Sequence, residues 1–144
     1  MEQTNRNPKV CSGMPPRDGE PDLTRDYRET HPAYRPLVYI CSPYCGDVEA
    51  NVERTEMFCR FALDKGVIPV APHLMFPRFM RDNDPDEREL ALFMDVVLMG
   101  KCREVWVLDD VVSRGMRLEI AKACQWRKTV RYFNAAFEEV ESYV

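Results

Sequence analysis

Apolar positions between residues 37 and 133 fall into two kinds of segment. Four short, continuously apolar runs rich in β-branched or aromatic residues predict buried strands at 37–42, 67–72, 104–109 and 129–133. Longer segments between them predict helices at 46–66, 86–102 and 113–127, with a closing helix from Ala135 to the end of the chain. Continuously apolar strands alternating with helices are typical of a parallel sheet that is covered on both faces. We therefore expect a single doubly wound, flavodoxin/Rossmann-like α/β domain with strand order about 2-1-3-4 and helices on both faces.

The first predicted helix has the clearest boundaries. Its apolar face recurs at steps of three and four residues, at Val48, Val52, Thr55, Cys59 and Ala62. Asp47 is a suitable N-cap and Gly66 a suitable stop. The same rules predict Ser113 as the cap of the third helix.

The first 35 residues differ in composition from the rest. They contain five prolines, many charged residues and almost no aliphatic residues. Such a segment buries too little apolar surface to offset its ordering entropy. We expect a flexible, proline-rich arm at 1–35 and the α/β domain at 36–144.

Charge and composition exclude several classes of function. The net charge of −4 and the pI near 5.3 argue against a nucleic-acid polymer as partner, because a phosphate-backbone binder needs a concentrated basic face. We expect no membrane partner, since no apolar run has the length of a membrane span, and the N-terminus lacks the pattern of a signal peptide. The six cysteines form no CxxC pair, which favours reduced thiols in a cytoplasmic protein.

Topology predicts where a ligand binds. In an open parallel sheet, ligands bind beyond the carboxyl ends of the strands, where the strand order reverses. With order 2-1-3, the loops 41–47 (CSPYCGD) and 109–116 (DDVVSRGM) face each other at that point. Both loops open helices, so free backbone N–H groups are available for a phosphate, carboxylate or sugar hydroxyl. Neither loop is a GxGxxG fingerprint or a P-loop.

Glu119 is unusual within the third helix. It lies beside Met116 and Ile120 on the stripe that is expected to be buried. Helical side chains lean toward the N-terminus, so its carboxylate can reach toward the crevice. A solvated surface glutamate is the alternative.

These segments together resemble the nucleoside 2-deoxyribosyltransferase-like superfamily, especially its short bacterial and phage branch. The resemblance is carried by YICSPYCGDVEAN, by PVAPHLMFP, and by SRGMRLEI after the VWVL strand, and it covers about residues 37–133. It implies cleavage or exchange of the N-glycosidic bond of a (deoxy)nucleoside or nucleoside 5′-monophosphate, without a cofactor. It also implies that Glu119 is the nucleophile.

The resemblance leaves the proton donor open. An aromatic hydroxyl near the nucleophile corresponds to Tyr44, or to Tyr39 if the latter is not simply a core residue. A second carboxylate corresponds to Asp95, Asp109 or Asp110; Asp95 is either buried and functional or an exposed helix residue. Asp109 ends the third strand and is favoured over Asp110.

The implied substrate contacts lie on the same two loops. Ser113, Gly115 and Met116 are expected on one side, where the first two would hold a 5′-hydroxyl or 5′-phosphate. The other side is expected to present Ser42, Pro43, Tyr44 and Gly46, with Asp110 as a further contact. His73 either contacts the base or caps the end of its strand. With two histidines and no ligand spacing, no metal is expected.

The resemblance and the second helix both predict association. That helix is apolar on more than one face, which is typical of a buried or interface helix. We therefore expect a homodimer or higher homo-oligomer.

Two other functions are considered. A non-catalytic nucleotide-binding or sensing module can use the same fold. An FMN-binding flavodoxin is disfavoured, because the loop 41–47 is not rich in serine and threonine.

Overall fold

The structure of the chain is a computed structural model that describes residues 17–30, 34–108 and 112–141. The chain divides into two units, Met1–Tyr34 and Arg35–Val144, which are described separately. The first contains helix α1 (Leu23–Thr30), where Arg25 and Glu29 form an exposed ion pair of 3.1 Å. No helix was expected in this segment from its composition. The flexibility of residues 1–35 remains a prediction.

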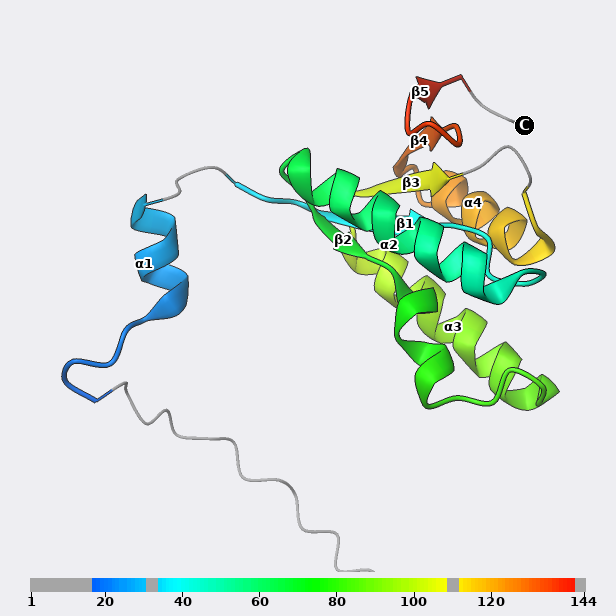
Figure 1. Cartoon of the computed structure of the whole chain (residues 1–144), viewed down its shortest axis with the longest axis horizontal. Helices are drawn as coiled ribbons and strands as arrows, with labels where there is room; N and C mark the ends of the chain where they lie inside the picture. Colours follow the sequence, from blue (N-terminus) through cyan, green and yellow to red (C-terminus); the bar gives the residue numbers. More distant parts are fainter. Residues whose placement is uncertain (1–16, 31–33, 109–111, 142–144) are drawn as a thin grey trace, which may run out of the picture. The chain divides into compact units, whose positions relative to one another are not determined.

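The second unit is built on one five-stranded sheet with the order β2-β1-β3-β4-β5 (Figure 1). The first four strands run parallel, with the bounds β1 Leu37–Cys41, β2 Ile68–Val70, β3 Glu104–Leu108 and β4 Thr129–Phe133. Strand β1 lies between β2 and β3 and pairs with both, and its residue Tyr39 lies opposite Val105 of β3. The doubly wound α/β class and the order 2-1-3-4 predicted from the sequence are confirmed.

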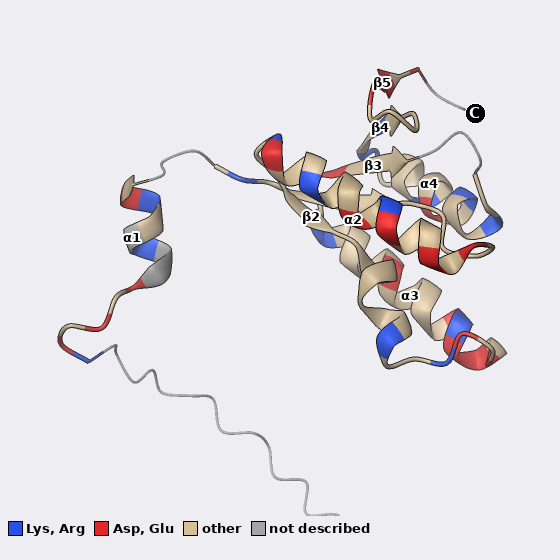
Figure 2. Cartoon of the chain, viewed as in Figure 1, with Lys and Arg blue, Asp and Glu red and all other residues tan. Residues whose placement is uncertain are grey.

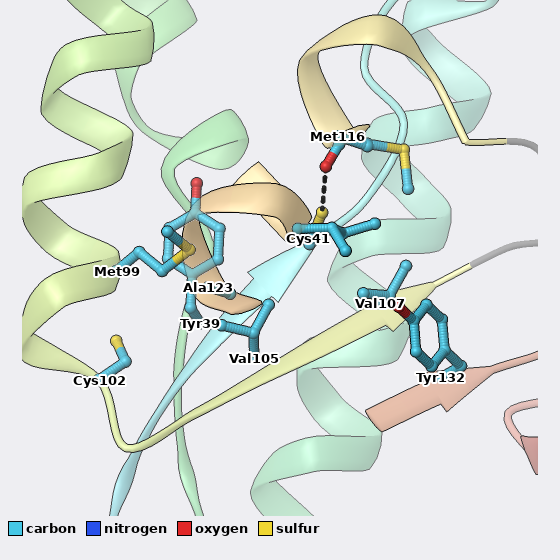
Figure 3. Packing of buried hydrophobic residues seen from close by; sticks show 10 residues of the cluster. Tyr39, Cys41, Met99, Cys102, Val105, Val107, Met116, Ala123 and Tyr132 are labelled. Atoms are coloured by element: carbon cyan, nitrogen blue, oxygen red, sulfur yellow. Dashed lines mark hydrogen bonds between the residues drawn. The ribbon is translucent and has the colours of Figure 1, made fainter. Parts of the chain in front are cut away.

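Helices cover both faces of the sheet (Figure 1). Alternate residues of β1 enter two different cores, because successive side chains of a strand point to opposite faces. Val38 and Ile40 pack with Phe58 of α2 (Val48–Asp64) on one face. On the other face, Tyr39 and Cys41 pack against α3 (Pro85–Lys101) and α4 (Arg114–Gln125), as Figure 3 shows in part. The side of β1 that carries Tyr39 is therefore the side that α4 covers.

The helix starts follow the predicted capping chemistry. The Asp47 carboxylate accepts a hydrogen bond of 3.2 Å from the Ala50 N–H, and the Ser113 hydroxyl accepts one of 3.3 Å from the Met116 N–H. Gly66 follows α2 with a φ of +88°, a conformation that favours glycine. The connection between β2 and α3 contains two short 3₁₀ turns, η1 (Pro72–Leu74) and η2 (Phe76–Arg78).

The predicted closing helix from Ala135 is wrong, because residues 134–140 form a turn and a short antiparallel strand. The Asn134 side chain accepts hydrogen bonds of 3.0 Å from the N–H groups of Ala136 and Glu138, which holds the backbone out of a helix. Strand β5 (Glu139–Val140) then pairs antiparallel with β4.

An arginine covers part of the sheet face that carries α2. The Arg131 guanidinium lies 5.1 Å from the Trp106 ring and 5.8 Å from the Phe133 ring. It is held there by a 2.7 Å ion pair with Glu139 of β5.

Basic and acidic residues are interspersed along the described helices of this unit, and none of these helices is purely basic (Figure 2). None of the helices among the described residues combines the length and apolarity needed to cross a membrane. The five cysteines within the described ranges are all free thiols.

Candidate active site

Glu119 lies in the interior of the domain rather than on its surface. The residue is 1% exposed, and it sits one and a half turns into α4, after the cap at Ser113. Its Oε1 accepts a hydrogen bond of 3.0 Å from the Tyr39 hydroxyl. The alternative of a solvated surface glutamate is therefore excluded.

Tyr39 is the residue whose part in the site the sequence left undecided. It is fully buried on β1, beside Met99 and Val105, and its hydroxyl points away from the strands (Figure 3). Burial and the neighbouring Glu119 raise the pKa of Tyr39 above its ordinary value, so the phenol stays a neutral donor. A usable signal was present in the sequence, because a buried tyrosine normally needs a partner for its hydroxyl.

Asp95 lies on α3 and is 3% exposed. Burial, followed by the nearby Glu119 carboxylate, raises the pKa of Asp95 to about 8. A carboxyl group buried beside a second carboxylate favours its neutral form, because burial and the neighbouring negative charge both disfavour its charged form. Asp95 therefore carries a proton at neutral pH.

Each of the two carboxyl groups has one oxygen without a partner. Asp95 Oδ1 and Glu119 Oε2 are buried and accept no hydrogen bond from any described residue. Buried polar atoms of this kind are rare in native proteins and call for an explanation. Here they leave lone pairs available to a ligand.

His73 and Tyr44 complete this part of the site. His73 Nε2, from η1, lies 3.9 Å from Glu119 Oε1. The Tyr44 ring stacks on the His73 ring with centroids 5.8 Å apart. Tyr44 thus contacts His73, whereas it is Tyr39 that contacts Glu119. A ligand atom from each of His73, Asp95 and Glu119 lies within 4.8 Å of the other two, so these three residues could hold a metal ion.

The first loop is tied to α2 by a chain of polar side chains that sequence reasoning missed. The Thr55 hydroxyl donates to the Asn51 carbonyl at 2.8 Å, so its contact of 2.9 Å with Ser42 must use the Ser42 proton. The Asn51 amide in turn donates to the carbonyls of Tyr44 and Cys45 at 3.2 and 3.0 Å. These bonds hold the loop in one position beside the carboxylates.

A cavity of about 720 Å³ joins these groups. Many of the predicted site residues line it: Ser42, Tyr44, His73, Asp95, Ser113, Gly115, Met116 and Glu119. Pro43 and Gly46 are not among the described residues that line it. Asp109 and Asp110 lie outside the described residues, so their predicted roles remain predictions.

The cavity also has walls that the sequence did not indicate. Phe76, Met80 and Leu92 contribute apolar surface, and Arg88 contributes a cation. These residues come from η2, from the turn after it and from α3. An apolar lining with a few convergent polar groups is typical of a small-molecule site.

Comparison with solved structures supports the fold. The structure of a 2-deoxyribosyltransferase from the psychrotolerant bacterium Bacillus psychrosaccharolyticus is similar, with a TM-score of 0.55 and 17% sequence identity. The similarity covers 73% of this chain and 77% of that chain. The resemblance to the nucleoside 2-deoxyribosyltransferase-like superfamily is thus confirmed for the fold.

Sequence comparison places the chain in a family. Among curated proteins, none matches the sequence. A family model described as a domain of unknown function, DUF7768, matches residues 36–133, which is more than half of the chain. The chain belongs to this DUF7768 family.

Proposed function

We propose that this protein cleaves the N-glycosidic bond of a (deoxy)nucleoside or nucleoside 5′-monophosphate, with Glu119 as the nucleophile. One observation carries the proposal. A buried glutamate has one oxygen held by a tyrosine hydroxyl and the other without a partner among the described residues, beside an aspartate whose pKa is raised and at the wall of a cavity of about 720 Å³. A nucleophile and a proton donor side by side are what displacement at an anomeric carbon requires.

The first step joins the sugar to the enzyme. Oε2 of Glu119 attacks the anomeric carbon, a carbon–oxygen bond forms, and the carbon–nitrogen bond to the base breaks with its electron pair leaving on the base. The Tyr39 hydroxyl holds Oε1 at 3.0 Å and orients the carboxylate during this attack. The product is a glycosyl ester on Glu119 and a free base.

Asp95 supplies the proton that the leaving base needs. Its pKa of about 8 keeps it protonated at neutral pH, which suits a general acid. After the base leaves, the Asp95 carboxylate accepts a proton from the attacking water or from a second base. Water releases the free sugar, whereas a second base completes a transfer.

The start of α4 and the apolar lining of the cavity suit the rest of the substrate. The free N–H groups at the start of α4, beside Ser113 and Gly115, favour an oxygen-rich group such as a 5′-hydroxyl or 5′-phosphate. The apolar residues around Leu92 suit a base.

The test is release of free base from a panel of deoxynucleosides, ribonucleosides and their 5′-monophosphates. Glu119→Gln keeps an oxygen for the Tyr39 hydroxyl, so the fold is retained while the nucleophile is lost. We expect this variant to bind substrate but to release no base. Full activity in Glu119→Gln would refute the assigned nucleophile.

A second variant tests the proton donor. Asp95→Asn should lose activity with ordinary bases but retain it with a substrate whose leaving group needs no proton. Asp86→Asn, an exposed carboxyl on the same helix, is the matched control and should behave as the wild type. Equal losses on both kinds of leaving group would refute Asp95 as the acid. If no substrate in the panel releases base while nucleotides still bind, the protein is a nucleotide-binding module.

We also propose that the protein is a homodimer or higher homo-oligomer. Leu90, Phe93 and Val97 are 49%, 64% and 45% exposed and form one apolar stripe on α3, at spacings of three and four residues. A light-scattering mass of one 16.8 kDa chain would contradict this proposal.

A further inference from the structure

Within the described part of the chain, the carboxyl pair has no lysine or arginine close enough to neutralise it. Asp95 and Glu119 are 3% and 1% exposed, yet no lysine or arginine among the described residues forms an ion pair with either. Asp95 Oδ1 and Glu119 Oε2 are buried without a hydrogen-bond partner among the residues that the structure describes. His73 is the third polar group at this point, and its Nε2 lies 3.9 Å from Glu119 Oε1.

We infer that His73, Asp95 and Glu119 form a binding site for one divalent transition-metal ion, and that this ion blocks the enzyme. The binding does not depend on the proposed function; only the inhibition does. A metal held by Glu119 occupies the lone pair that would attack the anomeric carbon. The ion would therefore compete with substrate.

Ligand type selects the class of ion. One imidazole nitrogen and two carboxylate oxygens suit Co²⁺, Zn²⁺ or Mn²⁺. Ca²⁺ needs six to eight oxygen ligands, which three residues do not supply. Metal–ligand bonds of roughly 2.0–2.2 Å in a tetrahedral site place any two ligand atoms about 3.3–3.6 Å apart. The ligand atoms of the three residues lie within 4.8 Å of one another, so binding requires the side chains to approach by at most about 1.5 Å.

His73 is the residue able to make that shift. Its side chain is 21% exposed and lies on the short turn η1, whereas the two carboxyl groups are fixed on the helices α3 and α4. Three ligands from one turn and two helices have no recognisable spacing in the sequence. The site becomes visible only when the fold brings these elements together.

Co²⁺ is the sharpest probe, because its absorption spectrum separates nitrogen and oxygen ligands from thiolate ligands. This matters because Cys45 is an exposed free thiol in the lining of the same cavity. The full-length chain, freed of metal with a chelator and then dialysed, would be titrated by calorimetry and by visible absorption. We expect one ion per chain and no thiolate charge-transfer band.

Variants assign the ligands. His73→Gln should weaken Co²⁺ binding at least tenfold, and Cys45→Ser should leave it unchanged. Co²⁺ should also raise the unfolding temperature of the wild type but not that of His73→Gln, which separates loss of a ligand from loss of the fold. The proposal is overturned if no saturable binding occurs, if His73→Gln binds as tightly as the wild type, or if the affinity disappears in Cys45→Ser.

Inhibition is measured separately, with the substrate identified by the base-release panel. Co²⁺ should raise KM without lowering kcat, and an excess of chelator should restore the original KM. Activation by Co²⁺ would overturn the inhibitory role. The titrations without substrate stand whether or not any nucleoside is cleaved, so failure of the enzyme proposal is distinguishable from failure of the metal site.

Discussion

Replacing Asp95 with asparagine gives the most direct test of the buried carboxyl pair. Asparagine has nearly the same shape but cannot ionise, so the variant removes the proton equilibrium and keeps the packing. The wild type and the variant should therefore differ in how their stability depends on pH. This difference arises from the pKa of Asp95 in the folded and unfolded states, so its measurement needs no substrate.

The magnitude follows from the two pKa values of Asp95. Its ordinary pKa is 3.8, and burial beside Glu119 raises the pKa in the folded state to about 8. Between these values the folded chain holds one proton that the unfolded chain has released. The free energy of unfolding should then fall as pH rises, by about 1.4 kcal/mol per pH unit. From pH 5.5 to 7.5 the loss amounts to roughly 2–3 kcal/mol, and it ends above about pH 8.

The measurement is urea unfolding at several pH values between 5 and 8.5, with a chelator present to keep metal out of the site. The quantity to compare is the difference in unfolding free energy between the wild type and Asp95→Asn at each pH. Background titrations common to both chains cancel in that difference. Asp86→Asn serves as the control and should show the slope of the wild type. If Asp95→Asn also keeps the slope of the wild type, the pair does not hold a proton at Asp95.

Three further substitutions test other parts of the structure. Tyr39→Phe removes the hydroxyl that donates to Glu119 Oε1, and it should lower the free energy of unfolding by about 1–3 kcal/mol. It should also lower kcat more than it changes KM, and an unchanged kcat would contradict an orienting role for Tyr39. Ser113→Ala removes the cap of α4 and should cost about 1 kcal/mol in urea unfolding, whereas no loss would show that the cap is dispensable. Arg131→Ala uncovers the Trp106 ring and should lower stability by about 1–2 kcal/mol, with a red shift in tryptophan emission. An unshifted spectrum would contradict the covering role of Arg131.

The fold could be predicted because its signals are local. Continuously apolar runs identified the four parallel strands, and Asp47 and Ser113 marked two helix starts through bonds to residues three positions away. The closing helix failed for an equally local reason, since the Asn134 side chain takes two backbone N–H groups that a helix would need. Two alanines after Asn134 favoured a helix by propensity, and the turn outweighed that preference.

The site could be predicted only in part, because its contacts join distant positions. The burial of Glu119 followed from its apolar neighbours on one helical stripe. Its partner Tyr39 lies 80 positions earlier in the chain, and no periodicity links the two. The same holds for His73 and Asp95, which meet Glu119 only through the packing of η1, α3 and α4.

The carboxyl pair is difficult to explain by stability alone. A buried aspartate without a cationic partner lowers stability relative to an apolar residue of similar size, and here a second carboxyl group stands beside it. The cost grows with pH as the proton on Asp95 is lost. Above about pH 8, Asp95→Asn should therefore be more stable than the wild type while being less active. A gain in stability together with a loss of activity is typical of residues kept for function. A variant that is both less stable and fully active would instead mark Asp95 as a structural residue.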